Sequence, residues 1–183
     1  MNLIESLGQI TDPRRKAGMR YGLVPMLLIA IMSIITGNTG YREMERFTKV
    51  NPTLFKKFFT SKTQHLPSHV TFREIIKNID FEEVLEIFHK WTQQYVTIER
   101  KEFLSIDGKS LNSTVTDYSD SYQNFVSMVS VFLHKRGQVI AMKQLENKKS
   151  SEIPTVQELI ELLDLKDVVY TLDALHCQKK LWI

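Results

Sequence analysis

The sequence predicts an α+β protein in which a helical domain, residues 1–99, is followed by a mixed α/β domain, residues 100–183. Through the first part, apolar residues recur at helical spacing, whereas the second part holds short runs rich in Val and Phe that are typical of buried strands. The chain has 183 residues, of which 43% are hydrophobic and 25% charged. This length and composition suit one globular domain or two small ones and exclude a disordered or fibrous chain.

The helical part is expected to form a small bundle around its most apolar segment. Leu23–Ile35 holds 13 residues, fewer than the roughly 20 that cross a membrane, so we expect a buried central helix with Pro25 in its first turn. Gly37–Gly40 ends this helix and offers Thr39 as the N-cap of the next one. Further helices are expected at Thr39–Lys49, Pro52–Phe59, from the N-cap Ser68 to Ile79, and at Phe81–Val96.

In the second part the pattern predicts the order β-β-β-α-β. The expected elements are a strand at Phe103–Ile106 that ends at Asp107-Gly108, a hairpin of Phe125–Leu133 and Val139–Leu145 joined by the turn His134–Gly137, a helix at Pro154–Leu163, and a strand at Val168–Leu172 that ends at Asp173. Thr116–Gln123 is expected to be a surface loop, and Ala174 onward the start of another helix.

Two aspartates stand where chemistry is expected. Asp107 and Asp173 each follow a predicted buried strand, and ligands of α/β sheets bind outside the carboxyl ends of the strands. If the two strands are neighbours, the carboxylates lie close together, and close carboxylates favour a proton or a cation between them. Hard oxygen ligands suit Mg²⁺ or Mn²⁺, and a pair of such ions supports phosphoryl transfer. The alternative is that both are turn residues, since Asp-Gly is a common turn dipeptide.

The charge is uneven along the chain. Residues 1–80 hold 12 Lys and Arg against 6 Asp and Glu, whereas the remainder is mildly acidic. A basic first part indicates an anionic partner, and Arg14, Arg15 and Lys16 form a cluster that suits a DNA backbone. The alternative is a solvated surface. The lone Cys177 excludes a disulfide framework and a Cys-rich zinc module, and fits a reducing, cytoplasmic setting.

Several motifs, in order, resemble those of insertion-sequence transposases of the H-repeat-associated type. FLSIDGKS at Phe103–Ser110 is similar to the Asp-Gly-Lys element of that family. Lys148–Lys179 is similar to a longer block that contains a Thr-(Ile/Leu)-Asp-Ala strand end and a Cys-Gln pair. In the first part, Asp12-Pro13-Arg14, Pro67-Ser68-His69 and Thr71-Phe72-Arg73 match as well. The resemblance covers nearly the whole chain.

The resemblance implies a DDE-type DNA transposase with a ribonuclease-H-like catalytic domain. Asp107 and Asp173 would be its first and second catalytic acids and would bind two Mg²⁺ or Mn²⁺ ions. Lys109 could contact a phosphate or be a solvated turn residue. The partners would be the ends of the insertion sequence and target DNA. A bacterial cytoplasmic location at the nucleoid is expected, with no membrane association, and self-association is left open.

The sequence also departs from the family. Asn112 stands near a usual Arg, and Ser150-Ser151-Glu152 replaces Ser-Asn-Glu. The family's third acid, a Glu well beyond the second aspartate, has no counterpart before Ile183, so we expect a truncated, inactive transposase with an incomplete sheet. Glu152 is a substitute acid or, as we prefer, a helix-entry residue. The other readings are a DNA-binding or regulatory fragment without catalysis, and a helical bundle that binds proteins.

Overall fold

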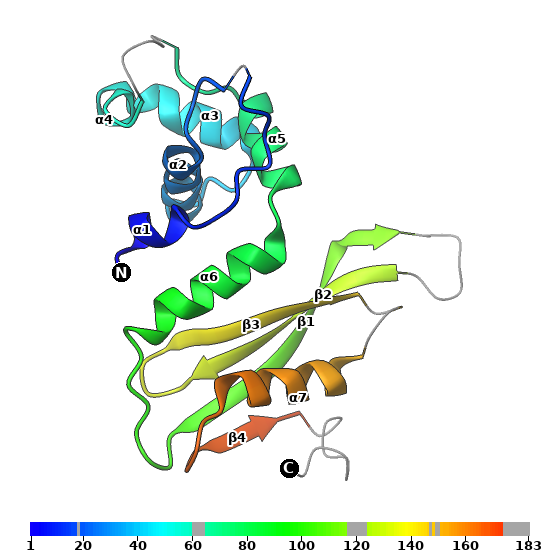
Figure 1. The fold of residues 1–183 in the computed structure, drawn as a ribbon. Coiled ribbons are helices and arrows are strands. Elements are labelled where there is room, and N and C mark those ends of the chain that lie inside the picture. The colour runs from blue at the N-terminus through cyan, green and yellow to red at the C-terminus, as the bar shows by residue number, and fades with distance from the viewer. Residues whose placement is uncertain (18, 60–64, 117–123, 147, 149–150, 174–183) are drawn as a thin grey trace. The chain divides into compact units, whose positions relative to one another are not determined.

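The computed structural model describes the chain except for residues 18, 60–64, 117–123, 147, 149–150 and 174–183. Within the described residues the chain forms seven helices and four strands, which confirms the α+β class (Figure 1). It divides into two compact units, Met1–Trp91 and Thr92–Ile183. This division comes earlier than the predicted boundary after residue 99, because Val96 and Ile98 already pack against the core of the second unit.

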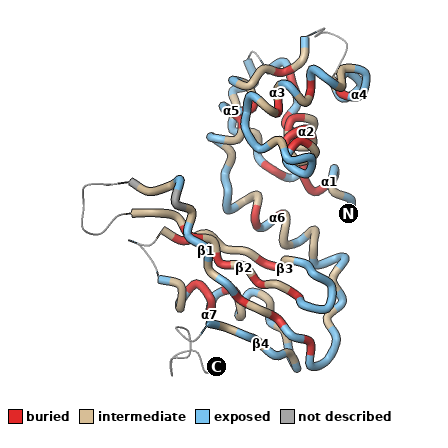
Figure 2. Tube along the Cα trace, turned by 180° about the vertical axis from the view of Figure 1, so that it is seen from behind, coloured by how far each residue is buried: buried red, intermediate tan, exposed pale blue. Residues whose placement is uncertain are grey.

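The first unit is a helical bundle built on the most apolar helix. Its helices are α1 (Leu3–Leu7), α2 (Leu23–Ile35), α3 (Tyr41–Val50), α4 (Pro52–Lys56), α5 (His69–Asn78) and α6 (Phe81–Gln93), the last of which runs into the second unit. In α2, Pro25 lies in the first turn as predicted, and Met26 and Ile29 are fully buried. Figure 2 shows buried segments along α2, and Phe72 and Ile75 of α5 are buried as well. No helix in the described part of the chain is both long and apolar enough to cross a membrane.

Three predicted helix ends were wrong. The N-cap of α3 is Gly40 rather than Thr39, because the Gly40 N–H donates to the Glu43 carboxylate and closes the first turn there. Helix α4 stops at Lys56, because the N–H groups of Phe58 and Phe59 donate to the carbonyls three residues back and form turns there. Helix α6 stops at Gln93, before the segment that joins the second core.

The second unit holds a mixed four-stranded sheet in the order β3-β2-β1-β4. The strands are β1 (Phe103–Thr116), β2 (Asn124–Leu133), β3 (Gln138–Glu146) and β4 (Val169–Leu172). The first three are antiparallel neighbours, and β4 lies parallel to β1 after the crossover through α7 (Glu152–Leu163). This confirms the predicted order β-β-β-α-β, while the helix expected from Ala174 lies outside the described residues.

One face of this sheet forms the core of the second unit. Helix α7 packs on that face against β2 and β3, and Figure 1 shows it lying across the sheet. Leu104 and Ile106 of β1 point to this face, opposite Leu133 and Val131 of β2 in the register. Alternate residues of β1 therefore point to the other face, where solvent is accessible.

A carboxylate joins α3 to the start of α5 in the first unit. Glu45 accepts hydrogen bonds from the backbone N–H of His69 at 2.8 Å, from the His69 ring Nδ1 at 2.5 Å and from Lys49 Nζ at 2.5 Å. These bonds, that to Lys49 first, lower the pKa of Glu45 from 4.5 to about 2. The Glu45 side chain is only 17% exposed, so it acts as an N-terminal cap supplied by a neighbouring helix.

Replacing Glu45 by Gln should destabilise the first unit at neutral pH. Because the folded-state pKa lies below the unfolded value, the stabilisation is present above about pH 4.5 and is lost as the pH falls towards 2. We expect the variant to lose about 1–2 kcal/mol in the free energy of unfolding at pH 7. The difference between variant and wild type should become smaller below about pH 4.5. Urea titrations at several pH values measure both. Glu86→Gln breaks an exposed pair with Lys90 at 4.0 Å and should have almost no effect. A constant Glu45→Gln deficit down to pH 3 would contradict the assignment.

Candidate functional site

The parallel pairing of β1 and β4 brings the two predicted acids together. The last pair in the β1–β4 register is Ile106 with Leu172, and the next residues along the chain are Asp107 and Asp173. Neighbouring strands lie about 4.8 Å apart, and residues in register point to the same face. Both aspartates are exposed. Two acids 66 positions apart in sequence therefore each follow directly on the last pair of two neighbouring parallel strands.

Asp107 was predicted to follow the end of a strand, but it lies within one. Strand β1 continues through Asp107-Gly108 to Thr116, and Asp107 is paired across to Ser130 of β2. The dipeptide does not turn because the antiparallel pairing with β2 runs on as far as Leu111. Asp173 does follow the end of its strand. Asp107 is therefore held in the sheet by its pairing with Ser130 of β2, although β4 on its other side has already ended at Leu172.

Lys109 lies on the same face of the sheet as Asp107. It is two residues farther along β1, a separation of about 7 Å along the strand, and its side chain is exposed. A cation at this distance can hold an anionic substrate beside the two carboxylates. Asn112, the other departure near this element, lies in β1 but its side chain is outside the described residues.

Three polar side chains tie β4 to β1 just before the acids. Ser105 Oγ lies 2.9 Å from Thr171 Oγ1, and Thr171 donates to the Leu104 carbonyl at 3.2 Å. Because a hydroxyl has one proton, Thr171 accepts from Ser105, and Ser105 in turn accepts from His134 Nε2, with which it is also hydrogen-bonded. The chain of bonds links the end of β2, β1 and β4. It thereby fixes the register that sets Asp173 beside Asp107.

Changing Thr171 to Val should loosen this connection while keeping the shape of the side chain. The variant removes the bonds to Ser105 and to Leu104, and we expect a loss of about 1 kcal/mol in the free energy of unfolding of the second unit. Amide hydrogen exchange in β4 should rise more than exchange in β2, because among the described strands β4 pairs with β1 alone. Thr114→Val is the comparison, because Thr114 lies in β1 and bonds within β1 and to β2; it should leave exchange in β4 unchanged. Equal β4 exchange in wild type and Thr171→Val would refute the role of these bonds.

Glu152 does not join the acid pair. It begins α7, as a helix-entry acid does, and its carboxylate lies over Gly108: a Cβ built on Gly108 would meet Glu152 Oε1 at 2.6 Å. Gly108 points to the α7 face of the sheet and Asp107 to the opposite face. Glu152 therefore packs on the other side of the strand. Its close approach depends on the missing side chain at residue 108.

The acid pair has no third partner among the described residues. Across that part of the chain, no group of three or more His, Cys, Asp or Glu side chains is placed to hold a metal ion. Cys177 lies in residues 174–183, outside the described part. The described geometry therefore offers two carboxylates on an exposed face.

The basic cluster of the first unit is divided by its pairing. Arg14 binds Asp12 through Nε at 2.8 Å and Nη2 at 2.7 Å, and its side chain is only 18% exposed. This bond lowers the pKa of Asp12. Arg15 and Lys16 are exposed. The charge of Arg14 is thus neutralised by Asp12, whereas the exposed side chains of Arg15 and Lys16 are accessible to a ligand.

Both units of the chain are similar to parts of known proteins. Residues 4–92 match the family model DDE_Tnp_1-associated. The chain is 29% identical over 178 residues to "Putative transposase YncI" of Escherichia coli O157:H7. It is 28% identical over the same length to "H repeat-associated putative transposase YbfD" of Escherichia coli K12. Each alignment covers 97% of this chain.

The chain is similar to proteins described as putative transposases, among them an H-repeat-associated one. It spans 45% of YncI of the O157:H7 strain, 70% of YncI of strain K12 and 68% of YbfD. The DDE_Tnp_1-associated match begins in α1 and ends in α6, so it covers the helical first unit. The alignments to the transposases extend through the second unit as well, including the segment that holds the acid pair.

Ser105 and Thr171 were not predicted from the sequence as site residues. A signal for them was available, because Ser105-Ile106-Asp107 and Thr171-Leu172-Asp173 share the order hydroxyl, aliphatic, aspartate. In a strand, the first and third residues point to the same face. A hydroxyl two residues before each acid therefore lies in line with it.

Proposed function

We propose that this chain is part of an insertion-sequence transposase whose second unit supplies two acidic ligands for metal-dependent cleavage and joining of DNA. The observation that supports the proposal is the β1–β4 register, whose last pair stands directly before Asp107 and Asp173, both of them exposed. The relationship to transposases supports it. DNA is the substrate that such chemistry takes.

The two carboxylates fit a divalent cation. Their repulsion is relieved by a cation between them, and neither of them has an ion-pair partner among the described residues. Hard oxygen ligands favour Mg²⁺ or Mn²⁺. When bound, such ions would activate the attacking oxygen and neutralise the leaving one in phosphoryl transfer. Asp107 and Asp173 would hold the ions, and Lys109 would contact the DNA phosphate.

Iron-directed cleavage of the protein tests the site without requiring enzymatic activity. Fe²⁺ replaces Mg²⁺ at carboxylate sites, and with ascorbate and peroxide it produces radicals that cut the nearby backbone. We expect cuts close to residues 107 and 173 that excess Mg²⁺ suppresses. Asp164→Asn should leave the pattern unchanged, because that residue caps the far end of α7. Cuts scattered along the chain, or cuts at 107 and 173 that Mg²⁺ does not reduce, would overturn the proposed metal site.

A DNA-binding chain without catalysis is the second candidate function. The charge of the first part favours it, because residues 1–80 hold 12 Lys and Arg against 6 Asp and Glu. If this second function is correct, the 183-residue chain binds DNA and does not nick supercoiled plasmid in Mg²⁺. Mg²⁺-dependent nicking that Asp107→Asn abolishes would instead show that two acids suffice.

A further inference from the structure

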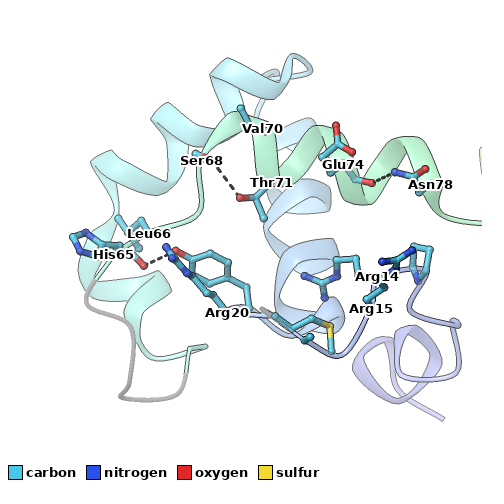
Figure 3. A pocket seen from close by; sticks show the side chains of 14 residues that line it. Arg14, Arg15, Arg20, His65, Leu66, Ser68, Val70, Thr71, Glu74 and Asn78 are labelled. Atoms are coloured by element: carbon cyan, nitrogen blue, oxygen red, sulfur yellow. Dashed lines mark hydrogen bonds between the residues drawn. The ribbon is translucent and has the colours of Figure 1, made fainter.

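The first unit has an open groove, and most of the charged side chains that line it are arginines. The groove has a volume of about 980 Å³ and runs between the segment around residues 13–21 and α5. Its charged lining residues are Arg14, Arg15, Arg20 and Glu74. Figure 3 shows Arg20 with His65 towards one end of the groove, and Arg14 and Arg15 towards the end near Asn78.

The walls of the groove are fixed by hydrogen bonds. Tyr21 Oη donates to the His65 carbonyl at 3.0 Å, which joins the two segments that border one end. Arg14 is held by Asp12 at the other end, so its guanidinium braces the wall. Arg15 and Arg20 are both exposed. Arg15 and Arg20 thus leave two solvent-exposed guanidinium groups at separate points of the groove.

The α5 wall adds neutral hydrogen-bonding groups between these charges. Ser68 and Thr71 contribute hydroxyls that lie 3.3 Å from each other, and the Asn78 amide donates one of its two N–H groups to the Glu74 carbonyl at 2.7 Å. From Ser68 to Asn78 this wall extends about 15 Å. Hydroxyl and amide groups interspersed with arginines are the set that proteins use to contact a nucleic-acid backbone.

We propose that this groove holds the phosphate backbone of duplex DNA, with Arg15 and Arg20 each binding a phosphate. The inference rests on the proposed function for its ligand and adds the residues that bind it. The groove is too long for a single phosphate, and its two exposed arginines favour a ligand with repeated negative charges over an uncharged one. Arg14 is a positioning residue here, because its charge is already paired.

Salt-dependent binding of the full chain to a fluorescein-labelled random-sequence duplex tests the proposal. Each phosphate contact contributes about 0.9 to the slope of log affinity against log salt. The double variant R15A/R20A should reduce the slope by about two and weaken binding at least about tenfold at low salt. The variant R15K/R20K should recover most of the slope, because lysine keeps the charge. Glu74→Gln should tighten binding, since it removes the acidic lining residue.

Arg42→Ala is the matched control, because Arg42 is exposed on α3 and does not line the groove. It should change neither slope nor affinity beyond about twofold. Wild-type affinity in R15A/R20A, or an equal loss in Arg42→Ala, would overturn the groove while leaving DNA as the partner of the chain. A wild-type chain that binds no duplex at all would overturn the groove and DNA binding together, whereas the iron-directed cuts at the acid pair would stand independently.

Discussion

Replacing Asp107 by Asn is expected to reduce the affinity of the chain for Mn²⁺ by about a hundredfold or more. Loss of even an outer-shell partner of a metal ligand costs about 10–100-fold, and Asn keeps the size of the side chain while removing its charge. The free Mn²⁺ signal in electron paramagnetic resonance, titrated against protein, measures this directly.

Asp173→Asn should have a similar effect, and the double variant should lose little more, because the two carboxylates act on the same ion. Asp164→Asn serves as the control. Asp164 ends α7 with a φ of 41°, a conformation that Asn also adopts. Additive losses in the double variant would indicate that Asp107 and Asp173 bind separate ions, and an unaltered titration of Asp107→Asn would exclude that residue as a ligand.

Leu159→Ala should have the largest effect on the stability of the second unit. Leu159 of α7 is fully buried in the core beneath the sheet. Truncating it leaves a cavity, and such changes cost about 2–5 kcal/mol. Hydrogen exchange in β1, β2 and β3, followed by mass spectrometry, reports the stability of this unit separately from that of the first unit.

Leu162→Ala on the same helix is the matched control. The Leu162 side chain is 57% exposed, so the change should stay within about 0.5 kcal/mol. Equal exchange rates in the two variants would contradict the position of α7 on the sheet. A rise confined to α7, with β1 and β2 still protected, would show that the sheet is stable without its helix.

Periodicity was enough to predict the order of elements. The apolar run of α2 and the helical spacing around Phe72 and Ile75 reflect burial on one face, and burial is what the structure shows. The β-β-β-α-β order followed from changes of period in the same way. Helix ends and the length of β1 were less predictable, because they depend on partners elsewhere: β1 runs through Asp107-Gly108 only because β2 pairs with it there.

The candidate site was predictable only in part. Two aspartates after apolar runs indicated a shared edge, but which strands are neighbours is not encoded locally, and only the β1–β4 register supplies it. The groove is harder still. Arg15 and Arg20 line the same groove as residues of α5 about 50 positions later, and hydrophobic periodicity does not predict such a pairing of segments. Which arginines stay accessible depends on the pairing of Arg14 with Asp12.

The pairing of β1 with β4 also has a consequence for the order of assembly during translation. Ser105 and Thr171, which bond across these strands, are separated by 66 residues, whereas the first unit is complete once Trp91 has been made. Domains fold as units, N-terminal first, at a synthesis rate of about 5–20 residues per second. A nascent chain therefore presents its arginine-lined groove several seconds before β4 leaves the ribosome, and the two carboxylates meet last.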